Sequence, residues 1–338
     1  AYGAVSGWLD CWHAPWNHRV RDAMLRFPIN DLLDEQRCHD LLLRVLHPDG
    51  LRCPHGHTLP ADQAPHDRHR APIFDYRCRE CGAVYNLFTG SIWSGSRLPC
   101  SKIVLILRGI AHSVPTIHLA EKLGLDRSHL LRRRHQIQSL VEERLFLSIL
   151  SDLVTEADEM YQNAGEKGIP HRDPNDPPRR RANSRRGRGS WDNDRPAVVG
   201  VASREHQTLH LRVCRRTNRE TLKPFVESHT VPGCHLYTDQ WRAYGRLGRT
   251  GRVHKRVYHA GPKRDWTVDA DGDGIREVHC NTLEGPWTGL RNHLRMFRGV
   301  SKKYLNQYVA VFEWAYRFRW ATDDALRMML IPSTPSTT

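Results

Sequence analysis

The chain has 338 residues, which is long for one ordinary domain and predicts two or three compact units. Hydrophobic residues make up 39% of it, and no run approaches the roughly 18 apolar residues that a membrane-spanning helix needs, so a helical membrane protein is excluded. The 51 Lys and Arg residues outnumber the 37 Asp and Glu residues, and the formal charge of +14 favours a polyanionic partner such as nucleic acid.

The cysteines favour metal binding over disulfides. There are nine of them, an odd number, and three lie at the spacing of metal ligands. Residues 1–10 lack the basic segment and the apolar run of a signal peptide. The cysteine pattern by itself suits a reducing cytosol better than a disulfide framework.

The first 150 residues divide into three stretches. Residues 1–50 contain an amphipathic helix over Cys38–Leu46, which ends at a turn over His47–Gly50. Residues 51–95 carry Cys, His and aromatic residues with little helical period. Residues 100–148 predict three helices, over Ser101–His112, Thr116–Leu123 and Arg127–Gln138.

Beyond residue 150 a polar insert precedes an α/β pattern. Residues 165–195 are rich in Pro, Arg, Asp, Asn and Gly, which predicts a loop or a disordered basic arm. Strand patterns then gather first and helical patterns last, which indicates an α/β unit beginning near Leu153. The predicted strands are Ala197–Ala202, Thr208–Cys214, His235–Thr238 and Val253–Tyr258, and the predicted helices are Thr221–His229, Asn281–Phe297 and Ser301–Trp320.

Residues 51–95 predict a zinc site. Two thiolates three residues apart, followed by Gly82, form a tight knuckle in which backbone N–H groups point at sulfur. Gly56 stands where a usual ribbon has its second cysteine, so a histidine must complete the tetrahedron. We favour His57 over His55, because more intervening residues let the imidazole turn inward. The predicted ligands are Cys53, Cys78, Cys81 and His57 or His55, a closed site of structural type.

The second and third helices of residues 100–148 resemble a helix-turn-helix. Gly124 lies in the turn, and Asp126 is placed to cap the basic helix that would enter the major groove. A helical bundle with a solvated basic face is the alternative. The residues of the third helix predicted to contact DNA are Arg127, Arg132, Arg133, Arg134 and Gln136.

Three acids stand near the ends or starts of separate elements. Asp158 lies near the end of a β-prone run, Asp239 follows a strand, and Glu284 opens a helix just after Asn281. Two-metal phosphoryl transfer needs carboxylates that converge from separate elements on two divalent ions. Spacing alone does not single out these three among 37 acidic residues.

From about Asp31 to Trp320 the chain resembles the zinc-ribbon bacterial insertion-sequence transposases related to the eukaryotic Merlin transposases, within the DDE superfamily. Two runs are specific in combination, Thr238–Tyr244 and His279–Glu284. The other matching segments are Glu35–Cys38, Asp49–Pro54, the Cys78/Cys81 knuckle, Tyr85–Ile92, Asp158-Glu159, Trp287, Arg291, Gly299–Ser301 and Tyr304-Leu305. The chain departs from the pattern at Gly56 and in its long insert over residues 170–190.

The resemblance implies an RNase H-like catalytic domain, an α/β fold with a mixed sheet flanked by helices, over residues 152–325. Asp158 would lie on the first strand, Asp239 after the fourth and Glu284 on a later helix, and together they would bind two Mg²⁺ or Mn²⁺ ions. Arg291 would contact DNA phosphate, and Asn281 would share or support the metal role.

The resemblance also implies a substrate and an assembly. The substrate would be double-stranded DNA, both transposon ends and target, and a homodimer or higher oligomer would hold two ends together, in the bacterial cytoplasm at the nucleoid. The zinc ribbon and the helical region would bind terminal repeats, and a basic arm would clamp phosphates. The arm residues predicted to contact DNA are Arg179, Arg180, Arg181, Arg185, Arg186 and Arg188.

Two alternatives remain open from the sequence. One is a zinc-ribbon DNA-binding regulator without catalysis, such as a domesticated transposase. The other is an RNase H-like nuclease that cuts DNA without joining it.

Overall fold

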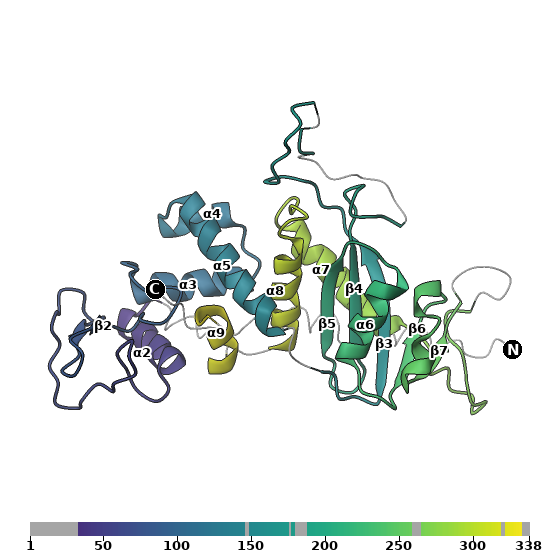
Figure 1. Cartoon of the computed structure of the whole chain (residues 1–338), viewed down its shortest axis with the longest axis horizontal. Helices are drawn as coiled ribbons and strands as arrows, with labels where there is room; N and C mark the ends of the chain where they lie inside the picture. Colours follow the sequence, from purple (N-terminus) through teal and green to yellow (C-terminus); the bar gives the residue numbers. More distant parts are fainter. Residues whose placement is uncertain are drawn as a thin grey trace, which may run out of the picture.

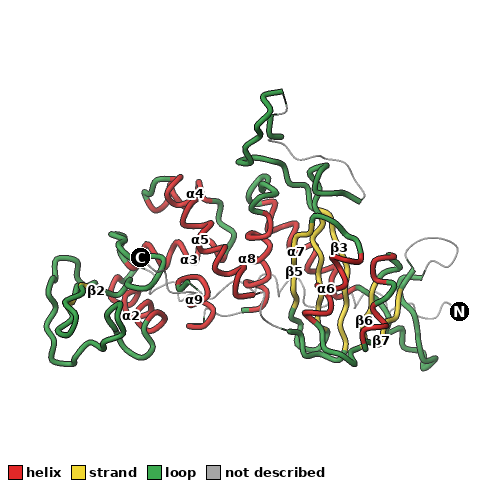
Figure 2. The backbone as a smooth tube through the Cα atoms, viewed as in Figure 1, coloured by secondary structure: helices red, strands yellow, loops and turns green. Residues whose placement is uncertain are grey.

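The computed structural model describes residues 33–145, 149–175, 177–179, 188–258, 265–318 and 322–332. Together they form an elongated molecule, with a small Cys-rich unit at one end, helices in the middle and a β-sheet at the other end (Figure 1; Figure 2). Among these residues, no helix is both long enough and apolar enough to cross a lipid bilayer.

The Cys-rich unit is a two-stranded hairpin that follows the first described helix. Helix α2 spans Glu35–Leu46, and the Asp34 carboxylate caps it by accepting the Arg37 N–H at 3.0 Å. Strands β1 (Tyr76–Arg77) and β2 (Val84–Tyr85) pair antiparallel. The predicted amphipathic helix is confirmed, and it begins at Glu35.

The three predicted helices of the middle region are confirmed. They are α3 (Cys100–Ala111), α4 (Thr116–Leu123) and α5 (Arg127–Leu145). Gly124 ends α4 in a left-handed conformation with φ of 61°, and Asp126 accepts the His129 N–H at 2.7 Å at the start of α5.

Helix α5 runs past the predicted end at Gln138. Leu140, Val141 and Leu145 continue its buried side, and α5 packs against α8 (Leu305–Arg317). Apolar contact with a helix far along the chain therefore sets its length.

The sheet has five strands in the order β5-β4-β3-β6-β7. The first three pair antiparallel, whereas β3, β6 and β7 run parallel to one another. This order and these directions make the predicted RNase H-like sheet. The strands are β3 (Val154–Tyr161), β4 (Ala197–Ser203), β5 (Leu209–Cys214), β6 (His235–Thr238) and β7 (Val253–Arg256).

Helices cover both faces of this sheet. On one face α7 (Asn281–Arg295) and α8 share a core with β4 and β5. On the other face α6 (Arg219–His229) packs with the short helix η2 (Arg242–Tyr244), and η3 (Leu247–Thr250) follows η2. The face under α7 is the one that concerns the candidate site.

The C-terminal helices join the two halves of the molecule. The predicted helix over Ser301–Trp320 begins only at Leu305, because residues 302–304 form a turn, and Trp320 lies outside the described residues. Helix α9 (Asp323–Leu330), which we did not predict, buries Leu326, Met329 and Leu330 in the core of α2, α3 and α5.

Candidate functional site

Parallel pairing of β3 with β6 brings two of the predicted acids together. The register pairs Ala157 of β3 with Thr238 of β6. The residues that follow them, Asp158 and Asp239, therefore lie side by side. Neighbouring strands in a sheet are about 4.8 Å apart. The Asp239 carboxylate also accepts the N–H of Trp241 at 2.8 Å, which fixes it at the turn after β6.

The Asp158 carboxylate is turned toward α7. The indole N–H of Trp287 donates to its Oδ2 at 2.9 Å. Gly200 is the partner of Asp158 on β4, and a Cβ there would come within 2.6 Å of the Trp287 ring. The absent side chain at Gly200 therefore makes room for the indole that orients Asp158.

Glu284 approaches the same place from α7. It lies in the first turn of the helix, one turn before Trp287 and exposed to solvent. Burial raises the pKa of Asp158 to about 7, and the neighbouring charges of Asp239 and Glu284 raise it as well. The three carboxylates repel one another. They are not among the groups of described side chains whose metal-binding atoms all lie within 4.8 Å of one another.

Glu156, a residue we did not predict, fixes the start of α7. It lies two positions before Asp158 and therefore on the same face of β3, and its side chain is fully buried. It accepts hydrogen bonds from the Thr282 N–H at 2.9 Å and the Thr282 hydroxyl at 2.7 Å, and from Arg204 Nε at 2.7 Å. Period-two alternation on β3 was the available signal, although the partners at Thr282 and Arg204 are not apparent from sequence.

Glu159 points away from this cluster. As the next residue after Asp158 it faces the other side of the sheet, where the Tyr244 hydroxyl donates to it at 2.8 Å. Burial raises its pKa to about 8. Of the adjacent pair in the sequence, only Asp158 faces α7.

The remaining residues of the predicted site lie along α7. Asn281 is the first residue of the helix and is exposed, and its backbone N–H donates to His279 Nδ1 at 3.3 Å. Arg291 is exposed two turns beyond Glu284. Both side chains are therefore free to meet solvent or a ligand on the helix that carries Glu284.

The basic insert is anchored by ion pairs to two buried acids. The Arg179 guanidinium bonds Glu166 at 2.6 Å and Asp194 at 2.5 Å, and Lys302 reaches the same two acids at 2.9 and 3.1 Å. Arg179 is thus bound to two carboxylates while its own side chain is 45% exposed, and its contact with DNA stays a prediction. Its predicted partners Arg180, Arg181, Arg185 and Arg186 lie outside the described residues.

Arg188 stands at the end of this insert, close to the acids. It is exposed, and its guanidinium carbon lies 3.5 Å above the ring of Trp241. Trp241 in turn bonds Asp239 through its backbone. The insert therefore returns to the sheet beside the candidate site.

The residues of α5 that were predicted to contact DNA differ in their exposure to solvent. Arg127, Arg132 and Gln136 are exposed, as a DNA contact requires. Arg134 is only 1% exposed and donates to the carbonyl of Val114, so its predicted role in DNA contact is wrong. Successive helical residues are turned by about 100°, which explains why adjacent arginines differ.

Arg133 is half-buried and ties α5 to the segment after the Cys-rich unit. It donates to the carbonyl of Ile92 and to Gln136 Oε1, and its guanidinium lies 5.1 Å from the centre of the Trp93 ring. These contacts hold the Cys-rich unit against the helical region.

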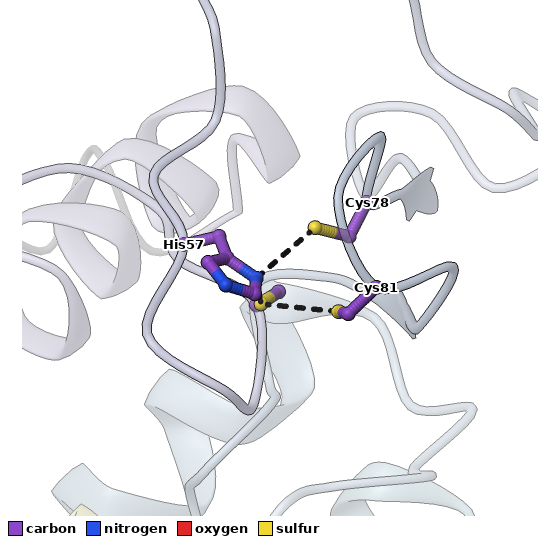
Figure 3. Close-up of side chains that lie close together, drawn as sticks. His57, Cys78 and Cys81 are labelled. Atoms are coloured by element: carbon purple, nitrogen blue, oxygen red, sulfur yellow. Dashed lines mark hydrogen bonds between the residues drawn. The ribbon is translucent and has the colours of Figure 1, made fainter.

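The predicted zinc ligands come together in the Cys-rich unit, and Figure 3 shows His57, Cys78 and Cys81 turned toward one another. The ligand atoms of these residues and Cys53 all lie within 4.8 Å of each other. The Cys53 and Cys81 sulfurs are 3.7 Å apart. Two thiolates bound to one tetrahedral zinc at about 2.3 Å would be about 3.8 Å apart, so the cluster is consistent with a zinc site.

The structure favours His57 over His55. Nδ1 of His57 lies 3.3 Å from Cys53 Sγ and 3.5 Å from Cys78 Sγ, whereas the exposed His55 reaches only Cys81. Nε2 of His57 faces Glu80 at 3.4 Å, and a carboxylate there orients a metal-binding imidazole. Backbone N–H groups of Cys81 and Glu80 lower the pKa of Cys78 to about 6, as the predicted knuckle requires.

Comparison with protein families gives one match over the second half of the chain. The family model of the ISXO2-like transposase domain matches residues 149–318, a range that contains all three acids. An uncharacterized protein in transposable element ISH50 of Halobacterium salinarum is 26% identical over 307 residues, 90% of this chain and 98% of that protein. An uncharacterized transposase-like protein of Haemophilus influenzae is 26% identical over 96 residues, 28% of this chain and 70% of that protein.

Among solved structures, a chain of the simian T-cell lymphotropic virus intasome in complex with PP2A regulatory subunit B56 gamma is similar at 10% identity. The match covers 61% of this chain and 66% of that one, with a TM-score of 0.26. At that score the fold rests on strand order and direction.

Proposed function

Because this chain belongs to the family of ISXO2-like transposase domains, we propose that it is a DNA transposase that cuts and joins DNA at Asp158, Asp239 and Glu284. The observation that carries the proposal is the register of β3 and β6, which sets Asp158 beside Asp239 under the helix of Glu284. A closer relation to the Merlin transposases is part of this proposal.

The three acids fit a pair of divalent cations. The pKa of Asp158 is raised by burial and by the charges of Asp239 and Glu284, and bound cations would neutralise that repulsion. Carboxylates from separate elements can hold two ions about 4 Å apart. When bound, Mg²⁺ or Mn²⁺ ions would stabilise negative charge on the attacking and leaving oxygens of a phosphodiester.

The protein's own residues would align the acids and the DNA. Trp287 holds the Asp158 carboxylate in one orientation, and Glu156 holds the start of α7 against β3. Asn281, one turn before Glu284, would support that acid, and Arg291, two turns beyond it, would bind a DNA phosphate.

The chemistry would proceed in two in-line substitutions at phosphorus. In the first, water attacks at the transposon end, a P–O bond forms, and the P–O3′ bond breaks to free a 3′-hydroxyl. In the second, that hydroxyl attacks a target phosphodiester, the new strand joint forms, and the target's own 3′-oxygen leaves. Neither step needs a covalent bond between enzyme and DNA.

Binding of the terminal repeats would fall to the N-terminal half. The Cys53, His57, Cys78 and Cys81 cluster would hold one structural Zn²⁺, and the exposed residues of α5 would enter the major groove. Arg188 would contact phosphate near the acids. Two ends must be held together, so we propose a homodimer or higher oligomer on DNA, acting at the bacterial nucleoid.

The test is a Mg²⁺-dependent strand-transfer assay with the element's terminal DNA, comparing the wild type with Asp239→Ala. We expect joined product from the wild type and none from the variant, while both bind the DNA ends equally. Binding without cutting or joining in Mg²⁺ or Mn²⁺ would favour a DNA-binding regulator. Cutting without joining would favour a nuclease.

A further inference from the structure

A hollow of about 480 Å³ lies beside the candidate active site, between the end of β3 and the C-terminal half of α7. Four arginines line it, Arg195, Arg291, Arg295 and Arg298, and no Asp or Glu does. We call this hollow the arginine pocket. Only Arg291 belongs to the residues discussed so far as DNA contacts.

The charges of the arginine pocket are not neutralised within the described part of the chain. None of the four guanidinium groups has a hydrogen bond or ion pair there, and Nε of Arg195 is buried without any partner. Arg179, only a short distance along the chain from Arg195, shows the contrast, since it bonds two carboxylates. Arg291, Arg295 and Arg298 are exposed, so Nε of Arg195 is the buried group among them. Buried polar groups are rarely left without partners, and this atom with three exposed positive charges around it favours an anionic ligand in the pocket.

The shape of the pocket points to a single nucleotide. A duplex backbone requires only a basic surface, whereas this is a hollow in the range of ligand pockets, roughly 300–1,000 Å³. Leu294 and Val300 offer apolar walls. Asn163 also lines it, and its Oδ1 is buried without a partner, as an acceptor for a base N–H would be.

The position of the pocket relates it to the cut. Arg291 is seven residues beyond Glu284 on α7, which is about 10 Å along a helix at 1.5 Å per residue. A DNA strand advances about 3.4 Å per nucleotide. A strand that runs along α7 from a phosphate at the acids would therefore reach the pocket within about three nucleotides.

We propose that the arginine pocket binds one nucleotide that is swung out of the duplex at the transposon end, within about three nucleotides of the cleaved phosphate. The arginines would hold its phosphate, and Asn163, Leu294 and Val300 would contact its base. Unpairing a nucleotide costs free energy, and contacts in a pocket offset that cost. The inference rests on the proposed function and deepens it.

The experiment measures affinity for end duplexes that carry one mismatch each. A mismatched base is easier to swing out, so a mismatch at the captured position should raise wild-type affinity several-fold, and mismatches elsewhere should not. The double variant Arg295→Ala/Arg298→Asn should lose this preference; Asn is chosen because Arg298 has a positive φ of 51°. The matched control is Arg246→Ala/Arg249→Asn, which removes two exposed arginines at the same spacing and should keep the preference.

The outcomes separate the two proposals. A wild type that cuts the ends but shows no preference for any mismatch overturns the pocket proposal alone. A double variant that keeps the preference overturns it as well. A wild type that neither prefers the terminal sequence nor cuts it overturns the proposed function, and the pocket proposal falls with it.

Discussion

The chain carries two clusters of metal-binding side chains that differ in how they are assembled. In the Cys-rich unit, Cys53, His57, Cys78 and Cys81 already lie at the distances of a tetrahedral site. At the sheet, Asp158, Asp239 and Glu284 are neighbours but do not form a compact cluster of metal-binding atoms. Burial and the charges of the other two acids raise the pKa of Asp158. The first cluster is closed, and the second is open to a substrate.

The difference follows from where the ligands come from. The cysteine cluster is built by two local turns, one that carries Cys53 and His57 and one between β1 and β2 that carries Cys78 and Cys81. A bound ion would hold these two turns together. The acids come from β3, the end of β6 and α7, and only the complete sheet brings them together. A closed site is typical of structural metal and an open one of catalysis. Loss of an acid at the sheet should therefore reduce catalysis and leave the fold stable, whereas loss of a ligand in the cysteine cluster should destabilise the Cys-rich unit.

The largest expected effect is on catalysis, from Asp158→Asn. Strand transfer should fall by at least about 10³-fold, because a carboxylate that holds the cations is lost. Thermal stability of the metal-free protein should stay equal or rise, since a buried repelling charge is removed. Calorimetry and strand-transfer assays on the same preparation measure both. A variant that unfolds would show that Asp158 supports the fold, and the contrast would fail.

The opposite response is expected from Cys78→Ser or His57→Ala. Each should lower zinc affinity by more than about 100-fold and make residues 51–95 sensitive to protease, because the ion would hold the two ligand-bearing turns together. The sheet should remain intact by circular dichroism. His55→Ala is the control and should retain zinc, since His55 contacts a single sulfur and is exposed. Zinc loss in His55→Ala with retention in His57→Ala would reverse the ligand assignment.

A smaller effect is expected from Glu156→Gln, which tests whether long-range placement of α7 matters. The amide can still accept a bond from Thr282 but loses the charge that binds Arg204. Charged hydrogen bonds contribute about 1.5–3 kcal/mol, so the rate of strand transfer should fall about 10- to 100-fold, with end-binding affinity unchanged. Equal losses of rate and affinity would point to general unfolding.

Sequence predicted most of the local structure and little of the long-range contact. Strand β6 was predicted at its observed bounds, and Asp126 was predicted as a cap, because both depend on neighbouring residues. Glu156 was missed because its partner Thr282 is 126 residues away. Helix α9 was missed because it is short and is stabilised by packing on α2 and α5.

The run Arg132–Arg134 shows the same limit. The three residues are identical in sequence, yet one is exposed, one is half-buried and one is buried. Direction around the helix follows from the 100° turn per residue, but which side meets Val114 or Ile92 depends on how α3, α4 and α5 pack. The sequence therefore predicted a basic helix without predicting its exposed face.

The smallest expected effect comes from Glu313, a buried carboxylate away from both clusters that tests whether a raised pKa by itself marks a metal site. Burial raises its pKa from 4.5 to about 8, and it faces His210, His229 and Arg317. Its two oxygens are bonded within the protein, one to the Leu211 N–H at 2.8 Å and the other to His210 Nδ1 at 3.0 Å.

Because the folded pKa of Glu313 lies above the ordinary value, its contribution to stability is full below pH 4.5 and is lost as the pH rises to 8. The wild type should thus lose stability relative to Glu313→Gln across that window, by a few kcal/mol at most. Thermal unfolding at a series of pH values measures this, and Mg²⁺ should leave the difference unchanged. Parallel curves would mean that His210 and Arg317 keep Glu313 ionised throughout. A Mg²⁺-dependent difference would mean that a raised pKa, and not the open placement of the three acids, is what distinguishes a metal site in this protein.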